Sequence, residues 1–165
     1  EKGHTELEAR HEIELEKYIK KVQIESRMMG ELATSHVLPA AIRYQNLLSN
    51  NIKGLKEAGL KEAAYTNQKQ ILEKISEHIN KTSDLVEKMI EARKVCNIMD
   101  NTRAKAIAYQ SQVKDAFFDE IRYNVDKLEL LVDDREWDLP KYRDCLLYTS
   151  PSPRDRTRSR MPSSA

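Results

Sequence analysis

The sequence predicts an all-α protein, an elongated antiparallel bundle of three long helical arms, the first kinked at Pro39. Apolar residues recur every three, four or seven positions through most of the chain up to Val132, which is the spacing of amphipathic helices. Residues that interrupt helices are rare, since there are four glycines and five prolines, and three of the prolines lie beyond residue 150. The connections between arms are short, so neighbouring arms are expected to run antiparallel.

The first arm is expected to begin near Thr5 and to run to about Leu38. Thr5 and Glu8 have the spacing of a capping box, in which two side chains satisfy backbone N–H groups that are otherwise unpaired. The stripe of this arm consists of Leu15, Ile19, Val22, Met29, Leu32 and His36. Pro39 disfavours helical geometry at Leu38 and has no N–H to donate, so a kink or short break is predicted there.

The arm is expected to resume with Pro39 as the first residue of a new helix, a position that proline favours. One face of this second segment carries Ile42, Gln45, Leu48, Ile52 and Leu55. Gly59 can adopt the left-handed conformation that ends many helices, so the segment should stop near Ala58.

The second arm is predicted over residues 61–99 and has the most regular pattern in the chain. Its seam repeats every seven residues through Gln68, Ile75, Thr82, Met89 and Cys96, with Leu72, Ile79, Val86 and Arg93 four positions after the first four. A helix with such a seam needs packing partners along its length.

The third arm is expected to start after an N-cap at Asp100 or Asn101 and to reach about Val132. Its seam consists of Ala106, Gln110, Val113, Phe117, Phe118, Ile121, Val125, Leu128 and Val132. The segment after this arm is expected to fold back on the bundle through the bulk of Trp137, Leu139 and Tyr142, with Pro140 fixing the turn.

Charge and apolar content argue against two classes of partner. The net charge of +1 includes +3 from the last 20 residues, so residues 1–145 carry −2. Because phosphate binding needs clustered basic residues, this balance argues against a nucleic-acid surface on the folded part. No apolar run approaches the roughly 18 residues that span a membrane. Cys96 and Cys145 lack metal-ligand spacing and fit reduced thiols in a cytoplasmic protein.

Candidate chemistry centres on histidines. Glu8 and His11 form one Glu-x-x-His unit, but a di-iron site in a bundle needs two, so a solvated charged face is favoured. His4 and His11 share a helix face that could chelate a stray transition metal, and a surface role is again favoured. His36 could titrate in a packed site, although a core histidine bonded to a carbonyl freed by Pro39 is the favoured interpretation.

Other motifs carry little chemistry. The sequence contains no glycine-rich phosphate loop, triad order or nucleophile elbow. Met28, Met29 and Met89 have core spacing, which favours packing roles. The basic run RDRTRSR is typical of a disordered tail, with contact to RNA or an acidic partner as the alternative. We therefore assign no catalytic, cofactor-binding or metal-binding residue in this chain.

Three stretches are distinctive beyond their periodicity, namely ELEARHEIELEKYIKKVQIESRMMGELATSHVLPAAIRYQN, ISEHINKTSDLVEKMIEARK and EIRYNVDKLELLVDDREWDLPKYRD. In this order they resemble the C-terminal helical region of type III glutamine synthetases. The resemblance covers about residues 5–144. Its most specific parts are SHVLPAAIRYQ at residues 35–45 and LELLVDDREWDLPKYR at residues 128–143.

The resemblance implies a cytoplasmic, homo-oligomeric parent enzyme of nitrogen metabolism, a glutamate-ammonia ligase. Such an enzyme uses ATP to convert the glutamate side-chain carboxylate into an acyl phosphate, which ammonia attacks to give glutamine. ATP and a divalent metal, Mg or Mn, bind in domains upstream of the helical region. The segment alone is therefore expected to be inactive and to serve in structure or oligomerisation. Its expected partners are the upstream catalytic domain and other subunits.

The resemblance also divides the chain. Residues 1–145 are expected to form the helical domain and residues 146–165 a disordered, non-native tail, because LLYTSPSPRDRTRSRMPSSA looks like translated sequencing-adapter read-through. A natural disordered tail is the alternative. The first residue is Glu rather than Met, which fits a fragment. Two other interpretations stay open: a stand-alone helical interaction or scaffold module, and a small metalloenzyme built in the bundle core.

Overall fold

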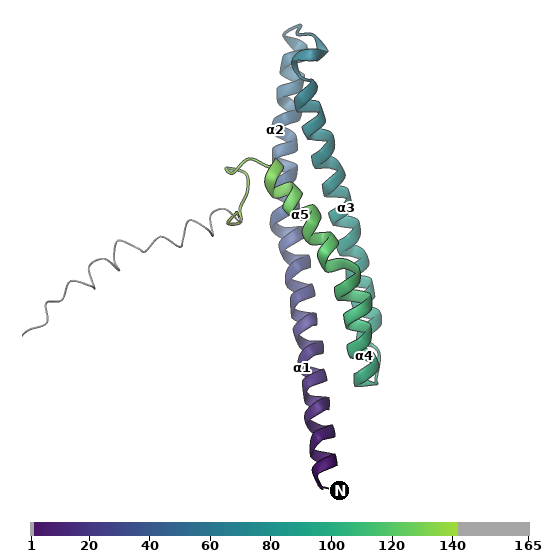
Figure 1. Ribbon diagram of the computed structural model, residues 1–165. Coiled ribbons are helices and arrows are strands. Elements are labelled where there is room, and N and C mark those ends of the chain that lie inside the picture. Colours follow the sequence, from purple (N-terminus) through teal and green to yellow (C-terminus); the bar gives the residue numbers. More distant parts are fainter. Residues whose placement is uncertain (1, 142–165) are drawn as a thin grey trace, which may run out of the picture.

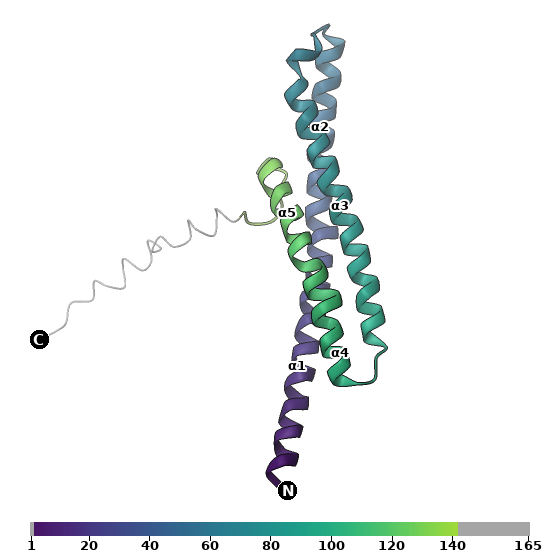
Figure 2. The same ribbon diagram turned by 45° about the vertical axis from the view of Figure 1, so that its right-hand side comes forward.

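The computed structural model describes the backbone of residues 2–141 and the side chains of residues 7–141. Every regular element in this range is helical: α1 (Lys2–Leu32), η1 (Ala33–Val37), α2 (Leu38–Glu57), η2 (Glu62–Ala64), α3 (Thr66–Asn97), α4 (Thr102–Ala108), η3 (Tyr109–Phe118) and α5 (Asp119–Leu131). Figures 1 and 2 show α1 and α2 as one long rod, with α3 running back beside it and α4 and α5 forming a third rod. The predicted antiparallel bundle of three long arms is confirmed.

The first arm begins earlier than predicted. α1 is already helical at Lys2, so Thr5 lies inside the helix and the predicted capping box of Thr5 and Glu8 is wrong. Gly3 does not delay the start, because a glycine inside a helix costs only about 1 kcal/mol relative to alanine. In both views the N-terminal part of α1 extends beyond the connection between α3 and α4 (Figures 1 and 2).

Pro39 perturbs the first arm one turn before its own position. Residues Ala33–Val37 form a π-helix, η1, and the Leu38 N–H donates to the carbonyl of Ala33, five residues back. Proline has no N–H for the regular ladder, and a wider turn rearranges the hydrogen bonds ahead of it. The predicted kink is therefore a π segment rather than a break, and α2 starts directly after it.

The buried face of the first arm differs from the predicted stripe. Small residues dominate this face, which consists of Ile19, Val22, Ser26, Gly30, Ala33, Val37, Ala40 and Ala41. Met28, Leu32 and Ile42, which were expected inside, are exposed by 48%, 38% and 46%. Gly30, Ala33 and Val37 are buried where Met29, Leu32 and His36 were predicted, so the buried face is shifted by one position already ahead of η1.

The connection between the first two arms has a defined hydrogen-bond pattern. Gly59 has a φ of 78°, the Leu60 N–H donates to the Leu55 carbonyl, and the Gly59 N–H donates to the Lys56 carbonyl. This is a Schellman motif, and it confirms the predicted end of α2. α3 starts at Thr66 instead of residue 61, because the chain first forms the short turn η2 and buries Tyr65.

The second and third arms follow their predicted seams. The central seam residues of α3, Ile75, Thr82, Met89 and Cys96, are all buried. Asn101 is the N-cap of α4, since its Oδ1 accepts a hydrogen bond of 2.8 Å from the Ala104 N–H. The third arm ends at Leu131 as expected, but its ten-residue π segment η3 was not predicted.

Two clusters form the core. The first joins α1, α3 and the third arm through buried residues that include Val22, Val86, Met89, Tyr109, Val113 and Ile121. The second lies around η1 and α2 and contains Val37, Ala40, Ala41, Ile75, Leu128, Val132 and Trp137. Trp137 and Leu139 pack against this cluster, as predicted. Tyr142 and Cys145 lie outside the described residues, as does the whole predicted tail.

Candidate functional site

A junction between the middle of the first arm and the residues after α5 is the most elaborate polar site of the described chain. The Arg43 Nη2 donates to Asp138 Oδ2 at 2.7 Å and to the Glu136 carbonyl at 3.0 Å, and its Nε donates to Glu136 Oε2 at 3.3 Å. These contacts raise the pKa of Arg43, first through the hydrogen bond to Asp138. We call residues 133–141 the C-terminal strap.

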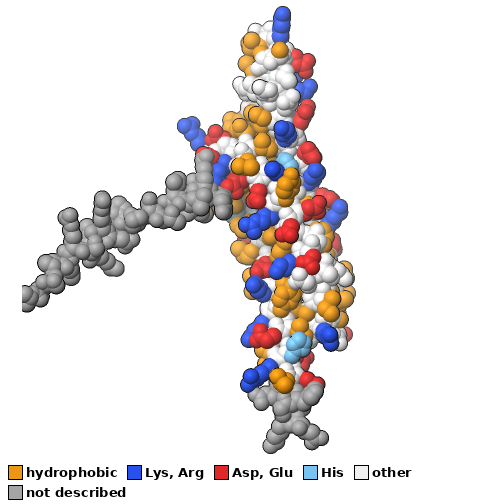
Figure 3. Space-filling model, viewed as in Figure 1, with side chains coloured by type: hydrophobic (Ala, Val, Ile, Leu, Met, Phe, Trp, Pro, Cys, Tyr) orange, Lys and Arg blue, Asp and Glu red, His pale blue; other side chains and the backbone are white. Residues whose placement is uncertain are grey.

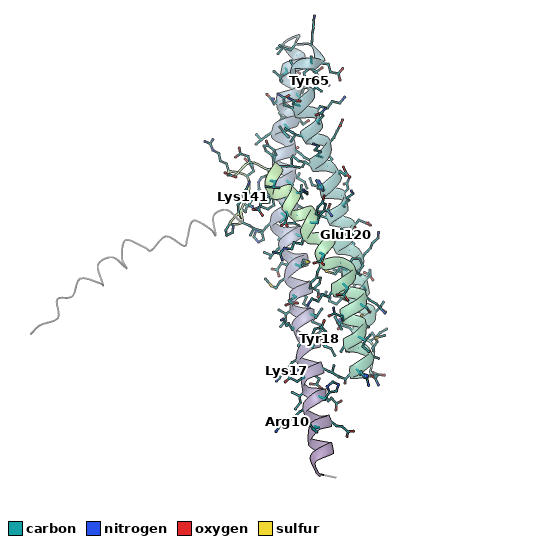
Figure 4. The ribbon with its side chains drawn as sticks, viewed as in Figure 1. Arg10, Lys17, Tyr18, Tyr65, Glu120 and Lys141 are labelled. Atoms are coloured by element: carbon teal, nitrogen blue, oxygen red, sulfur yellow. The ribbon has the colours of Figure 1, made fainter. Side chains whose placement is uncertain are left out.

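Lys141 holds the other end of the strap. Its Nζ donates to the carbonyls of Glu129 at 2.8 Å and Val132 at 2.7 Å, and lies 2.7 Å from Asp134 Oδ1. The last carbonyls of a helix lack partners within it and carry partial negative charge, so an ammonium group stabilises this end of α5. Figure 4 places Lys141 beside the C-terminal end of α5.

The junction joins the two stretches that are the most specific parts of the resemblance. Arg43, Ala40 and Ala41 come from residues 35–45, and Trp137 and Lys141 come from residues 128–143. Trp137 is 8% exposed and belongs to the same cluster as the two alanines. The small side chains of Ala40 and Ala41 leave room for the indole ring within this cluster.

An open groove of about 640 Å³ lies beside this junction, between α1 and η1 on one side and η3 and α5 on the other. Its apolar lining consists of Met28, Met29, Leu32, Ala33, Val37, Phe118, Ile121, Val125 and Leu139. Glu25, Lys114, Asp115, Asp119 and Arg122 add charges of both signs. Figure 3 shows apolar side chains among acidic and basic ones along the bundle. A groove with an apolar lining between charged residues is typical of a surface that binds another protein.

A partly buried polar network joins the three arms near the other end of the bundle. The Tyr109 hydroxyl donates to Asn97 Oδ1 at 2.6 Å, and Gln23 Nε2 lies 2.8 Å from Asn97 Oδ1 and 3.1 Å from the Tyr109 oxygen. Burial raises the pKa of Tyr109. The hydroxyl of Tyr18, a residue of α1 (Figure 4), also donates to Gln110 Oε1 in η3, and burial raises the pKa of Tyr18. The predicted seam of the third arm did not include Tyr109, which lies in the sequence between the predicted seam residues Ala106 and Gln110.

The predicted histidine and cysteine residues do not converge. Glu8 and His11 are both exposed on α1, and the side chain of His4 lies outside the described residues. His36 is half-buried, and the expected bond from its ring to a carbonyl is not among the hydrogen bonds of the described residues. Cys96 is a free buried thiol whose pKa is raised by burial. Within residues 7–141, no three ligand side chains gather around a point that could hold a metal ion.

One partly buried histidine contact was not predicted. A ring nitrogen of His78 lies 2.9 Å from Asn124 Oδ1, and Asn124 Nδ2 donates to the Glu120 carbonyl at 2.8 Å. Asn124 is buried in α5 although its side chain is polar, and no periodic pattern distinguishes it from a surface asparagine.

None of the helices between residues 2 and 141 is long and apolar enough to cross a membrane.

Comparisons with known proteins agree with the resemblance. Residues 3–56 match the family model described as glutamine synthetase C-terminal domain. A Bacteroides fragilis (strain YCH46) protein named glutamine synthetase is 44% identical over 150 residues, which cover 89% of this chain and 20% of that protein. A Dictyostelium discoideum protein named type-3 glutamine synthetase is 26% identical over 145 residues, covering 86% of this chain and 20% of that protein. The chain thus spans about a fifth of the length of these relatives.

Proposed function

Because the chain belongs to the glutamine synthetase family through its C-terminal domain, we propose that it serves as the helical structural and oligomerisation region of a glutamine synthetase subunit. The parent enzyme acts in the cytoplasm, activates glutamate with ATP and a divalent metal, and transfers ammonia to the acyl phosphate. Those reactions take place in domains upstream of this region, and the segment alone has no ligase activity.

The groove between α1 and α5 carries the proposal. Met28 and Leu32 form part of its lining while 48% and 38% of their surfaces remain exposed. Apolar side chains grouped at an open groove mark protein contact surfaces. Glu25 and Arg122 add charges that remain hydrated or can pair with a partner.

The strap supports the same role by fixing the shape of this surface. Leu139 lines the groove. The preceding residue, Asp138, accepts a hydrogen bond from Arg43, and Lys141 donates to the Val132 carbonyl. A docking surface that is already ordered loses less conformational entropy when a partner binds. The partners proposed for it are the catalytic domain of the same subunit and neighbouring subunits.

The test uses a full-length relative of the glutamine synthetase family. Removing the region that corresponds to residues 5–144 is expected to reduce the number of subunits per particle in analytical ultracentrifugation and to lower glutamine formation. Because a large deletion can unfold an enzyme, the paired substitutions Met28→Glu and Leu32→Glu at the corresponding positions provide a second variant, since both side chains are already partly exposed. An enzyme that keeps its number of subunits per particle, its stability and its activity in both variants contradicts the proposal.

Activity of this chain itself gives a separate test. Purified protein incubated with glutamate, ATP, ammonium and Mg or Mn should form no glutamine. Upstream sequence in frame with a catalytic domain supports the parent enzyme, whereas a start codon near Glu1 favours the alternative of a stand-alone scaffold module.

A further inference from the structure

Two arginines lie at the same level of the antiparallel pair formed by α1 and α3. Gln23 Nε2 donates to Asn97 Oδ1 at 2.8 Å, which fixes how the two helices are aligned. Arg27 lies one turn after Gln23 on α1, and Arg93 lies one turn before Asn97 on α3. One turn further on, a Cβ at Gly30 would contact α3 side chains at 3.7 Å, which agrees with this alignment.

The guanidinium group of Arg93 lacks a partner in the described part of the chain. Its Nε is buried without a hydrogen-bond acceptor among residues 7–141, while the side chain as a whole is half-buried. Within the same residues, no ion pair involves Arg93 or the exposed Arg27, and Glu31, one turn after Arg27, forms none either. Because a buried charged donor without an acceptor costs free energy, this position favours an acceptor from another molecule.

The charges that act on the neighbouring Tyr109 hydroxyl are cationic. Burial raises the pKa of Tyr109, and the positive charges of Arg93 and Arg27 act in the opposite direction. No carboxylate of the described residues contributes to this shift, whereas two carboxylates raise the pKa of Tyr18. The two arginines therefore create a local positive potential, which attracts anions.

We propose that Arg27 and Arg93 bind a phosphate group between them, at the exposed edge of the polar network around Tyr109. Each guanidinium presents N–H donors in a planar fork that fits two oxygens of one anion. Two forks together fit a tetrahedral phosphate, whereas a carboxylate has only two oxygens to share between them. The ligand is therefore inorganic phosphate or a small molecule that carries a phosphate group.

Isothermal titration calorimetry of the 165-residue chain with inorganic phosphate tests the proposal. The ionic strength is held constant, because salt screens exposed charges. Saturable binding is expected, and Arg27→Gln and Arg93→Gln should each weaken it about tenfold or more. Lys94→Gln is the matched control, because it removes one positive charge from α3 at an exposed residue that pairs with Glu91 at 2.7 Å. It should leave phosphate binding unchanged.

Nitrogen-15 NMR locates the contact and shows whether the variants fold. The Nε–H signals of Arg27 and Arg93 should both shift during the phosphate titration, and each is assigned by its loss in the corresponding variant. The Nε–H signal of Arg43 is the internal control and should stay in place, since this group already donates to Glu136 Oε2 at 3.3 Å. A variant that keeps its other backbone signals is folded, so its loss of affinity belongs to the site.

Methyl phosphate and acetate identify the source of the anion. Equal binding of methyl phosphate and inorganic phosphate supports a phosphate group carried by a larger molecule, whereas binding of inorganic phosphate alone supports the free ion. Acetate should bind at least about tenfold more weakly than either.

Three results overturn the proposal. These are an absence of saturation up to about 10 mM phosphate, acetate that binds as tightly as phosphate, and a Lys94→Gln variant that loses as much affinity as Arg93→Gln. The structural role proposed above is tested separately by the number of subunits per particle and does not depend on this site.

Discussion

The Tyr109 hydroxyl donates a 2.6 Å hydrogen bond to Asn97 Oδ1 and so joins the start of η3 to the end of α3. Tyr109 is fully buried, and Gln23 from α1 bonds the same two groups. Three arms therefore share one polar contact at the edge of the apolar cluster, where Asn97 is exposed. A partly buried hydrogen bond of this kind helps to align the arms, because leaving the buried Tyr109 hydroxyl unpaired costs free energy.

Removing this hydroxyl should destabilise the bundle. Tyr109→Phe leaves Asn97 and Gln23 without one partner and is expected to lower the free energy of unfolding by about 1–2 kcal/mol in urea denaturation. Tyr123→Phe is the control, since Tyr123 is 57% exposed, and should change stability little. Equal effects of the two substitutions would contradict the importance of the network.

The strap should loosen when its arginine is removed. Trp137 is the only tryptophan in the chain, so its fluorescence reports on the strap. Arg43→Ala removes the partner of Glu136 and Asp138, and we expect a red-shifted emission and faster acrylamide quenching as the indole gains solvent. Arg103→Ala, on exposed α4 surface, should leave the spectrum as it is. An unchanged spectrum in Arg43→Ala means that apolar packing alone holds the strap.

Gly30 should accept one methyl group and reject a large side chain. A Cβ at this position meets Met89 Cε and Val86 Cγ1 at 3.7 Å, which is ordinary contact. Gly30→Ala should therefore stabilise the helix by about 0.5–1 kcal/mol. Gly30→Leu should cost about 1–3 kcal/mol through overpacking. Gly54→Leu is the comparison, because nothing lies within 4 Å of a Cβ there. A stable Gly30→Leu variant would contradict close packing of α1 on α3.

Stability should fall at alkaline pH. Burial raises the pKa of Cys96 and Tyr109 above their ordinary values of 9.0 and 10.0. The folded state therefore favours the neutral thiol and phenol, and their contribution is complete below the ordinary pKa and is lost as pH rises above it. Urea midpoints should decline from pH 9 upward. The double variant Cys96→Ala and Tyr109→Phe should decline less steeply, and parallel curves would show that other groups cause the loss.

The domain boundary can be tested by deletion. Residues 146–165 contain few apolar side chains and are expected to add few contacts. A chain that ends at Cys145 should keep the helicity and melting temperature of the full chain in circular dichroism. A large fall in melting temperature would show that the tail belongs to the fold.

Most of the fold was predictable because its signals are local. The seam of α3 and the caps at Asn101 and Gly59 depend on residues a few positions apart, and each is confirmed. The incorrect predictions concern which face of the first arm is buried and where its helix begins. Leu32 and Met28 are exposed because the first arm buries the face that carries Gly30 and Ala33, and the predicted capping box at Thr5 lies inside a helix that starts earlier.

The candidate site was not predictable in the same way. Arg43 and Asp138 are 95 positions apart, and each residue resembles an ordinary surface charge. Tyr109 and Asn124 interrupt or flank the apolar seams, and only the neighbouring arms reveal that they are buried. The stretches at residues 35–45 and 128–143 carried the most specific part of the family resemblance, but the sequence did not indicate that they contact each other.

The sequence by itself determined three amphipathic arms, their order, their short antiparallel connections and the family resemblance, because helix periodicity and capping depend on neighbours within about seven residues. Only the tertiary structure decided which apolar face of α1 is buried, where Pro39 acts, and that Arg43 meets the strap. Those outcomes depend on close approach of helices and on contacts between distant residues. Small side chains at Gly30, Ala40 and Ala41 permit that approach.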